Sequence, residues 1–244
     1  MAAIGTLLRR EMTAYFATPV AYVFIIIFLV MAGAFTFYLG NFYERGIADL
    51  EPFFRFHPWL FLFLVPAISM RLWAEERKSG TIELLLTLPV TAAQAVLGKY
   101  LAAWLFLGLA LSLTFPMWVT VNFLGDPDNG AIAAAYLGSW LMSGGYLAIG
   151  ACMSALTRNQ VVAFILSVVV CFGFLLSGLP MIMNLFSGWA PQVLLDGIAS
   201  LSFLAHFADI SKGVIDLRDL VYFGLVIGFW LLANVIVLDW KKAD

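Results

Sequence analysis

Long stretches without a charged residue are the sequence feature that most restricts how this chain can fold. Residues 159–195 contain no Asp, Glu, Lys or Arg over 37 positions, and residues 20–39, 100–125, 131–157 and 220–238 are also uncharged. Hydrophobic residues make up 63% of the sequence and charged residues 11%, whereas soluble domains have about 45–50% apolar and about 25% charged residues. Because so few charges cannot cover so much apolar surface in water, we expect an all-α integral membrane protein solvated by lipid.

The same composition excludes several function classes. A net charge of −2 gives no basic footprint for nucleic acid. Cys152 and Cys171 both lie in apolar runs, and His57 and His206 are too far apart in sequence for a metal-ligand motif. No Gly-rich phosphate loop is present, and no Ser–His or paired-Asp arrangement is evident in the apolar runs. We therefore expect a non-catalytic chain that binds neither a metal nor a cofactor itself.

The apolar runs predict six transmembrane helices, since one span needs about 20 apolar residues. A cleavable signal peptide is a weaker interpretation of the first run, because that run continues past its small-residue site to Leu39. Thr91 and Gln94 have the spacing of a capping box, which predicts a helix start before the third span. For residues 186–217, short external re-entrant helices and a plain loop remain equally open. The expected spans are residues 20–40, 53–72, 98–124, 131–157, 160–185 and 219–239.

The distribution of basic residues predicts the orientation of these spans. An even number of spans places both chain ends on one side, and that side would hold nine of the 13 Lys and Arg residues. Since cytoplasmic loops carry an excess of Lys and Arg, we expect both termini in the cytoplasm and the protein in a bacterial cytoplasmic (inner) membrane. The nine residues are Arg9, Arg10, Arg71, Arg77, Lys78, Lys99, Arg158, Lys241 and Lys242.

The first candidate site is an amphipathic N-terminal helix over residues 4–17. Its apolar side chains recur at helical spacing, while Arg9 and Arg10 fall on the opposite face. This pattern is typical of a helix lying in the membrane interface. Glu11 falls within the apolar arc, and the pattern gives no reason for an acid there. A mechanical role and a plain anchor helix are equally compatible with the sequence.

The second candidate site is the segment of residues 74–89, AEERKSGTIELLLTLP, between the second and third expected spans. Gly80 is expected to end the helix that leaves the membrane, and Thr81 can cap a new helix with Glu83 in its first turn. A short capped helix with a charged lead suits docking to a cytoplasmic partner, and a topology-setting loop is the alternative. The candidate docking residues are Glu75, Glu76, Arg77, Lys78, Ser79, Gly80, Thr81, Glu83, Leu84 and Leu85.

This segment also carries a resemblance to a known family. The stretch MRLWAEERKSGTIELLLTLPVTAAQAVLGKY resembles the hallmark of type-2 ATP-binding-cassette (ABC) transporter permeases. The stretches FHPWLFLFLVPAISMRLWAEE and TRNQVVAFILSVVVCF are similar to the permease branch associated with bacterial gliding motility. The resemblance covers nearly the whole chain, which would make residues 1–244 a single transmembrane permease domain.

The resemblance implies a fold, partners and a mechanism. It implies the six-helix type-2 exporter fold, with a connecting helix near residues 4–16 and a coupling helix near residues 79–88 that docks on a separate ATPase. It implies a dimer of ABC ATPase subunits, which bind ATP and Mg, and a second permease chain that is identical or related. In the gliding branch the related permease carries a large extracytoplasmic domain. Membrane lipid surrounds the assembly.

Two functions are compatible with these expectations. In the first, the chain is a permease subunit that couples ATP hydrolysis by the partner ATPase to export of an unidentified substrate. In the second, it is a transmission or scaffold subunit that relays ATPase movement to an external partner without moving solute. A secondary carrier is disfavoured, because such proteins place ionisable residues inside the bundle.

Overall fold

The computed structural model describes residues 2–81, 90–186 and 191–240. All regular secondary structure in these ranges is helical. The helices are α1 (Ala2–Ala17), α2 (Pro19–Ala34), the π-helix η1 (Phe35–Leu39), α3 (Glu51–Arg55), α4 (His57–Ser69), α5 (Arg71–Ser79), α7 (Ala92–Ser112), α8 (Phe115–Leu124), α9 (Asn129–Leu156), α10 (Gln160–Leu176), α11 (Pro180–Phe186), α12 (Gln192–Ala199), α13 (Phe203–Ser211) and α14 (Leu217–Trp240).

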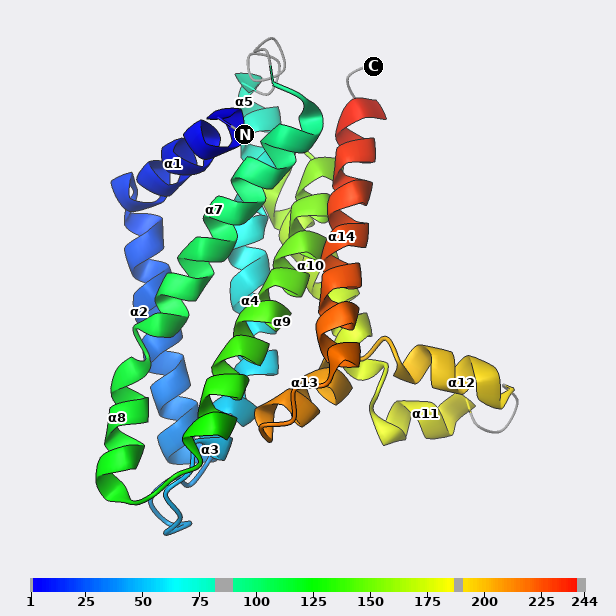
Figure 1. Cartoon of the computed structure of the whole chain (residues 1–244). Helices are drawn as coiled ribbons and strands as arrows, with labels where there is room; N and C mark the ends of the chain where they lie inside the picture. The colour runs from blue at the N-terminus through cyan, green and yellow to red at the C-terminus, as the bar shows by residue number, and fades with distance from the viewer. Residues whose placement is uncertain (1, 82–89, 187–190, 241–244) are drawn as a thin grey trace.

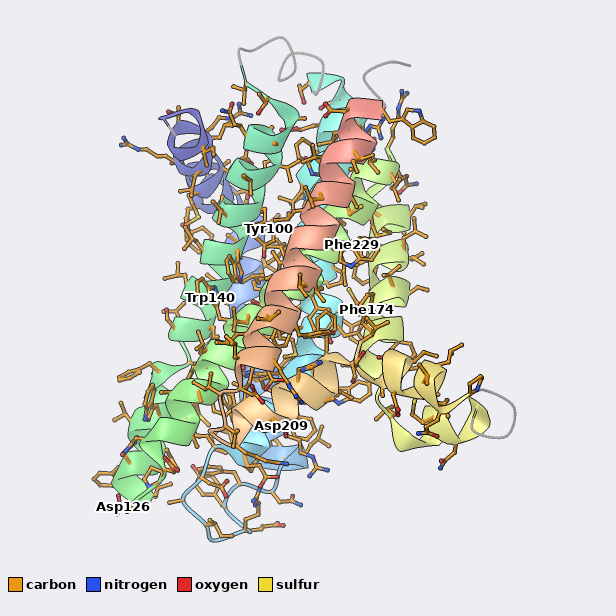
Figure 2. The ribbon with its side chains drawn as sticks, turned by 45° about the vertical axis from the view of Figure 1, so that its right-hand side comes forward. Tyr100, Asp126, Trp140, Phe174, Asp209 and Phe229 are labelled. Carbon is orange, nitrogen blue, oxygen red and sulfur yellow. The ribbon has the colours of Figure 1, made fainter. Side chains whose placement is uncertain are left out.

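Helix α9 is the centre of the bundle (Figure 1). It packs against α4, α5, α7, α10, α13 and α14, and four consecutive residues at its middle, Tyr146 to Ile149, are fully buried. By contrast, α2 and α14 expose large apolar side chains such as Ile26 and Phe229. A helix with one apolar face buried and another apolar face exposed is expected where lipid replaces water. Figure 2 shows Phe229 on the outward side of α14.

Small residues let α7 and α9 approach closely. Trp104 and Trp140 stack with ring centroids 4.3 Å apart, and each indole N–H donates to the backbone carbonyl oxygen of the other residue, at 2.9 and 3.2 Å. The Tyr100 hydroxyl donates to the carbonyl oxygen of Gly144 at 3.1 Å. A Cβ atom at Gly144 would lie 2.7 Å from the Trp104 indole nitrogen. These contacts join the middles of two long helices through buried and partly buried polar groups.

Four helical segments are long and apolar enough to cross a bilayer: residues 19–39, 92–124, 129–156 and 217–240. The pair α12 and α13, bent by 59°, would make a fifth if it is one span, and α10 is a shorter apolar helix. Helices α4 and α10 also run alongside α9 (Figure 1). The chain is a multi-pass membrane protein, and the count of six spans stays a prediction.

Several expected spans are interrupted or end early. The second consists of α3, α4 and α5 in series, and the third breaks between α7 and α8 just before Pro116. The expected helix over residues 160–185 is wrong in its end, because α10 stops at Leu176 and α11 starts separately at Pro180. Proline disfavours helical conformation at the preceding residue. A Cβ atom at Gly178 would lie 2.3 Å from the Ser202 hydroxyl, so α13 approaches at the break.

The two ends of the bundle differ in what they carry. Helices α1 and α5 and the last turn of α14 lie at one end, while α3, the α8–α9 connection and α13 lie at the other (Figure 1). Figure 2 places Asp126 and Asp209 at the end opposite α1. The region after α10 forms short helices rather than a plain loop over its described residues.

Candidate functional site

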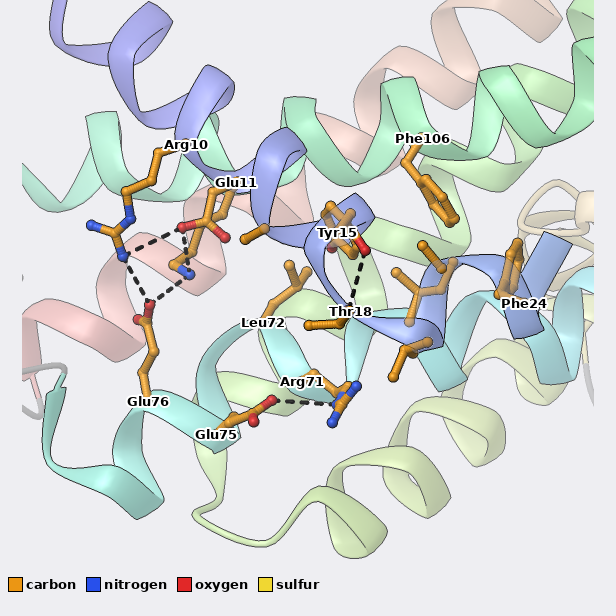
Figure 3. A pocket seen from close by; sticks show the side chains of 15 residues that line it. Arg10, Glu11, Tyr15, Thr18, Phe24, Arg71, Leu72, Glu75, Glu76 and Phe106 are labelled. Carbon is orange, nitrogen blue, oxygen red and sulfur yellow. Dashed lines mark hydrogen bonds and ion pairs between the residues drawn. The ribbon is translucent and has the colours of Figure 1, made fainter.

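A buried lysine holds together three helices at the α1 end of the bundle. Lys99, in the second turn of α7, places its Nζ atom 2.8 Å from Glu76 Oε1 on α5 and 3.3 Å from Glu11 Oε1 on α1. Arg10 joins the same two carboxylates, at 3.7 and 3.9 Å. Figure 3 shows Arg10, Glu11 and Glu76 turned toward one another, with dashed lines marking the ion pairs. We call these four residues the Lys99 cluster.

The environment of Lys99 compensates the burial of its side chain, which is only 4% exposed. A lone buried ammonium group would be strongly destabilising, whereas one between two carboxylates is compensated. The Lys99 cluster contains two basic and two acidic residues, and Nζ also lies 5.3 Å from the centroid of the Trp73 ring. The network also explains why Glu11 lies in the apolar arc of α1. That arc faces α7, where Lys99 pairs with Glu11.

Helix α1 packs closely against α7 beside the Lys99 cluster. A Cβ atom at Gly98 would lie 2.8 Å from the Leu7 Cβ atom, so a larger residue would push α1 away. Further along, the rings of Tyr15 and Phe106 stack with centroids 5.1 Å apart. The N-terminal helix is thus fixed against the bundle by apolar contacts on both sides of its charged pair.

Helix α5 is also fixed to the central helix α9. The Ser154 hydroxyl oxygen accepts from the backbone N–H groups of Trp73 and Ala74, at 3.1 and 3.0 Å, and donates to the carbonyl oxygen of Met70 at 2.8 Å. It therefore caps the first turn of α5, where N–H groups lack partners within the helix. Arg77 donates to the carbonyl oxygen of Ala155, in the last turn of α9, where a cation is favoured.

The remaining predicted site residues lie at the surface near this junction. Glu75 pairs with Arg71 at 3.3 Å, and Arg9 and Lys78 are exposed. Gly80 ends α5 with a φ of 74°, in the left-handed region that glycine adopts readily, which confirms the predicted helix end. The hydroxyl groups of Ser79 and Thr81 lie 2.9 Å apart. Glu83, Leu84 and Leu85, in the predicted coupling helix, lie outside the described residues.

Comparison with known families identifies the kind of protein that carries this arrangement. The sequence matches the family model described as ABC-2 family transporter protein over residues 52–237, which is more than half of the chain. The chain belongs to the ABC-2 transporter family. No curated protein matches the sequence. Membership makes the chain a membrane permease subunit of an ABC transporter, a component that works with an ABC ATPase.

Sequence reasoning missed two residues of this ABC-2 permease site. Lys99 was counted only as a basic residue near a span end, yet a lone lysine inside a long apolar helix is a signal that an acid must face it. Ser154 lies among small residues whose default interpretation is helix packing. The predicted capping box at Thr91 and Gln94 is confirmed, with both reciprocal hydrogen bonds present at 3.1 and 3.2 Å.

A second expectation about the ABC-2 permease is wrong, besides the end of α10. The apolar runs do contain a Ser–His pair, because the Nδ1 atom of His57 lies 2.8 Å from the Ser139 hydroxyl. Sequence spacing could not show it, since the two residues come from α4 and α9. Both side chains are fully buried, and the rings of Phe28, Phe53 and Phe61 surround the imidazole. A substrate could not reach this pair, so we interpret it as a packing contact.

Proposed function

We propose that this permease subunit is part of an exporter and that α5 transmits movement of the partner ATPase into the bundle. The coupling helix would lie near residues 79–88, directly after α5, and would dock on the ATPase with the charged lead of residues 75–78. The observation that carries the proposal is the attachment of α5 to three other helices, through Glu76 to α1 and α7 and through Ser154 to α9.

These attachments make α5 suited to rigid-body transmission. A push on residues 79–88 would pass through Gly80, the C-cap of α5, into α5, whose other end is capped by Ser154. Since α9 is the most buried of the four long apolar segments and packs against much of the described bundle, its displacement would move the bundle as a unit. Packed interfaces of this kind change between discrete arrangements.

The proposed assembly follows from the family and from charge. Two ATPase subunits carrying ATP and Mg would dock on two permease chains, either identical or paired with a related chain of the gliding-motility branch. The excess of Lys and Arg at the α1 end supports an inner-membrane orientation with both termini cytoplasmic. The course of α4 and α10 beside α9 supports six spans.

A charge-reversal pair tests the docking site. Glu83→Arg should lower recovery of the ATPase with the permease by about tenfold, because a like-charge contact in an interface costs more than 1.4 kcal/mol. The matched control is Glu44→Arg, an exposed acid outside the expected docking segment. The measurement is the ATPase co-purified in mild detergent and its vanadate-sensitive activity. Equal recovery for both variants would reject the docking assignment.

The packing around α9 favours a second candidate function. Its central residues are fully buried by neighbouring helices, so the described bundle is filled around the middle of α9. A relay subunit would move an external partner without moving solute, as the same attachments of α5 would allow. ATP-dependent flux of a transported compound in proteoliposomes containing the complete complex would decide for export. ATP hydrolysis without flux, accompanied by movement of an external partner, would decide for the relay.

A further inference from the structure

A pocket of about 290 Å³ lies between α1, α2, α4, α5 and α7, beside the Lys99 cluster. Ligand pockets commonly span about 300–1,000 Å³, so this one has room for a small polar group with a short apolar extension. Figure 3 shows its two ends, with Arg10, Glu11 and Glu76 at one and Phe24 and Phe106 at the other. The pocket is therefore amphipathic along its length.

The charged part of the pocket is balanced. Three basic and three acidic side chains line it, so their formal charges cancel. An anion alone would meet as many carboxylates as cations, and a cation alone would meet as many basic groups as acids. A ligand with both signs, a phosphate and an ammonium group a few bonds apart, matches this lining. The six residues are Arg10, Arg71, Lys99, Glu11, Glu75 and Glu76.

One carboxylate oxygen in this lining lacks a hydrogen-bond donor. Glu76 Oε1 accepts the Lys99 ammonium, while Glu76 Oε2 is buried and has no partner among the described residues. A buried acceptor without a donor is costly, and a ligand that supplies an N–H group would remove that cost. A primary ammonium group has three such donors, whereas a quaternary ammonium has none. The phosphate would lie toward Arg71, which is partly exposed in the same pocket.

The apolar part of the pocket leads away from the charges toward α2. Val20 and Val23 on α2 are exposed, at the side of the molecule where lipid is expected. A hydrocarbon chain could therefore leave the pocket along α2 without crossing water. The apolar lining includes Tyr15, Val20, Ala21, Phe24, Ile68, Leu72 and Phe106.

We propose that this pocket binds the headgroup of an ethanolamine phospholipid. Its ammonium group donates to Glu76, its phosphate contacts Arg71, and one acyl chain follows α2 past Phe24. The bound lipid links α1 to α2 and α5. The choice of ethanolamine over choline rests on the donor that Glu76 Oε2 lacks, and the choice over glycerol rests on the charge balance of the lining.

Native mass spectrometry of the full-length chain in mild detergent tests the proposal. Dioctanoyl phosphatidylethanolamine, phosphatidylcholine and phosphatidylglycerol are added at equal concentration, and water-soluble glycerophosphoethanolamine forms a fourth arm. We expect retention of the ethanolamine lipid to exceed that of the other two lipids by about tenfold, the ratio that one charge-assisted hydrogen bond provides. Equal retention of the three lipids would overturn the proposal. Retention of glycerophosphoethanolamine as strong as that of the lipid would overturn the role of the acyl chain.

Substitutions inside the pocket and a control beside it test where the lipid binds. Ala21→Leu adds bulk inside the pocket and should abolish the preference for ethanolamine, while Val23→Leu on the exposed face of the same helix should leave it intact. Glu76→Gln should lower retention of the ethanolamine lipid toward that of the choline lipid and leave retention of the choline lipid nearly unchanged. If Ala21→Leu fails to fold, Val20→Phe at the mouth of the pocket replaces it. A folded pocket variant that keeps the full preference contradicts the site.

Discussion

The hydroxyl group of Ser154, on α9, accepts hydrogen bonds from backbone N–H groups at the start of α5. Ser154→Ala leaves the N–H groups of Trp73 and Ala74 without their partner, so we expect a loss of about 1–3 kcal/mol in the free energy of unfolding. The control is Ser167→Ala, an equally buried serine whose hydroxyl donates to Ala163 within its own helix. Unfolding in detergent by increasing denaturant measures both. Similar losses in the two variants would show that Ser154 does not cap α5.

Lys99 compensates two acids that come from other helices. Lys99→Met keeps the length of the side chain but leaves Glu11 and Glu76 with only the half-exposed Arg10, so we expect a loss of about 3–5 kcal/mol of stability. Adding Glu11→Gln and Glu76→Gln to this variant should restore much of the loss, because no buried charge then lacks a partner. Thermal unfolding of the three forms provides the measurement. A single variant as stable as the parent would contradict the role of the cluster.

At the residue scale the sequence predicts local features better than distant pairs. The capping box at Thr91 and the helix end at Gly80 could be predicted because each depends on residues within four positions. The Lys99 cluster could not, since its members are separated by 65 positions between Glu11 and Glu76 and by 23 between Glu76 and Lys99. Predicting such pairs requires knowing how whole helices lie relative to one another, and no local sequence pattern contains that information.

At the scale of elements, α4 and α9 meet at a glycine. A Cβ atom at Gly150 would lie 1.9 Å from the Ser69 hydroxyl oxygen and 2.6 Å from its Cβ atom. Gly150→Ala should therefore separate these helices and destabilise the fold by about 1–3 kcal/mol, as overpacking does. Gly173→Ala in α10, where the new Cβ meets nothing within 4 Å, should be neutral or slightly stabilising.

A second substitution makes this test specific. Ser69→Gly removes the side chain that the new methyl group meets, so the Gly150→Ala and Ser69→Gly double variant should be more stable than Gly150→Ala alone. The thermal unfolding midpoint of the purified permease is the measurement. Additive losses in the double variant would mean that the two residues do not meet as the structure has them.

Hydropathy predicted which segments are helical more reliably than it predicted where the helices end. Uncharged runs predicted α2, α7, α9 and α14, because length and apolarity are sufficient for a span. The early end of α10 was not predicted, since an apolar stretch continues to Leu195 and hydropathy does not register a change of direction. Pro180 was the relevant local signal, and the approach of Ser202 to Gly178 was not visible in sequence.

At the scale of the whole molecule, the orientation can be measured directly. Lys78→Cys at the α5 end and Asp126→Cys between α8 and α9 are exposed and lie at opposite ends of the bundle. In intact cells a membrane-impermeant maleimide should label the second variant and label the first only after the membrane is opened. The natural cysteines, Cys152 and Cys171, are buried, so the parent chain is the background control. The reverse labelling pattern would invert the proposed topology.

The Lys99 cluster has a consequence for biosynthesis. Glu11 and Glu76 are translated before Lys99, so the membrane-inserting chain holds two acids at the interface until α7 emerges. Helices α1 and α5 can therefore complete their ion pairs with Lys99 only after residues 92–124, the second of the four long apolar segments, have been synthesised. In a nascent chain arrested before residue 99, Glu11 and Glu76 would lack Lys99 and would stay accessible to quality-control proteases. Synthesis beyond that point would allow Lys99 to pair with both acids and bury them. Because of this order of synthesis, the N-terminal half reaches its native arrangement only when α7 is inserted.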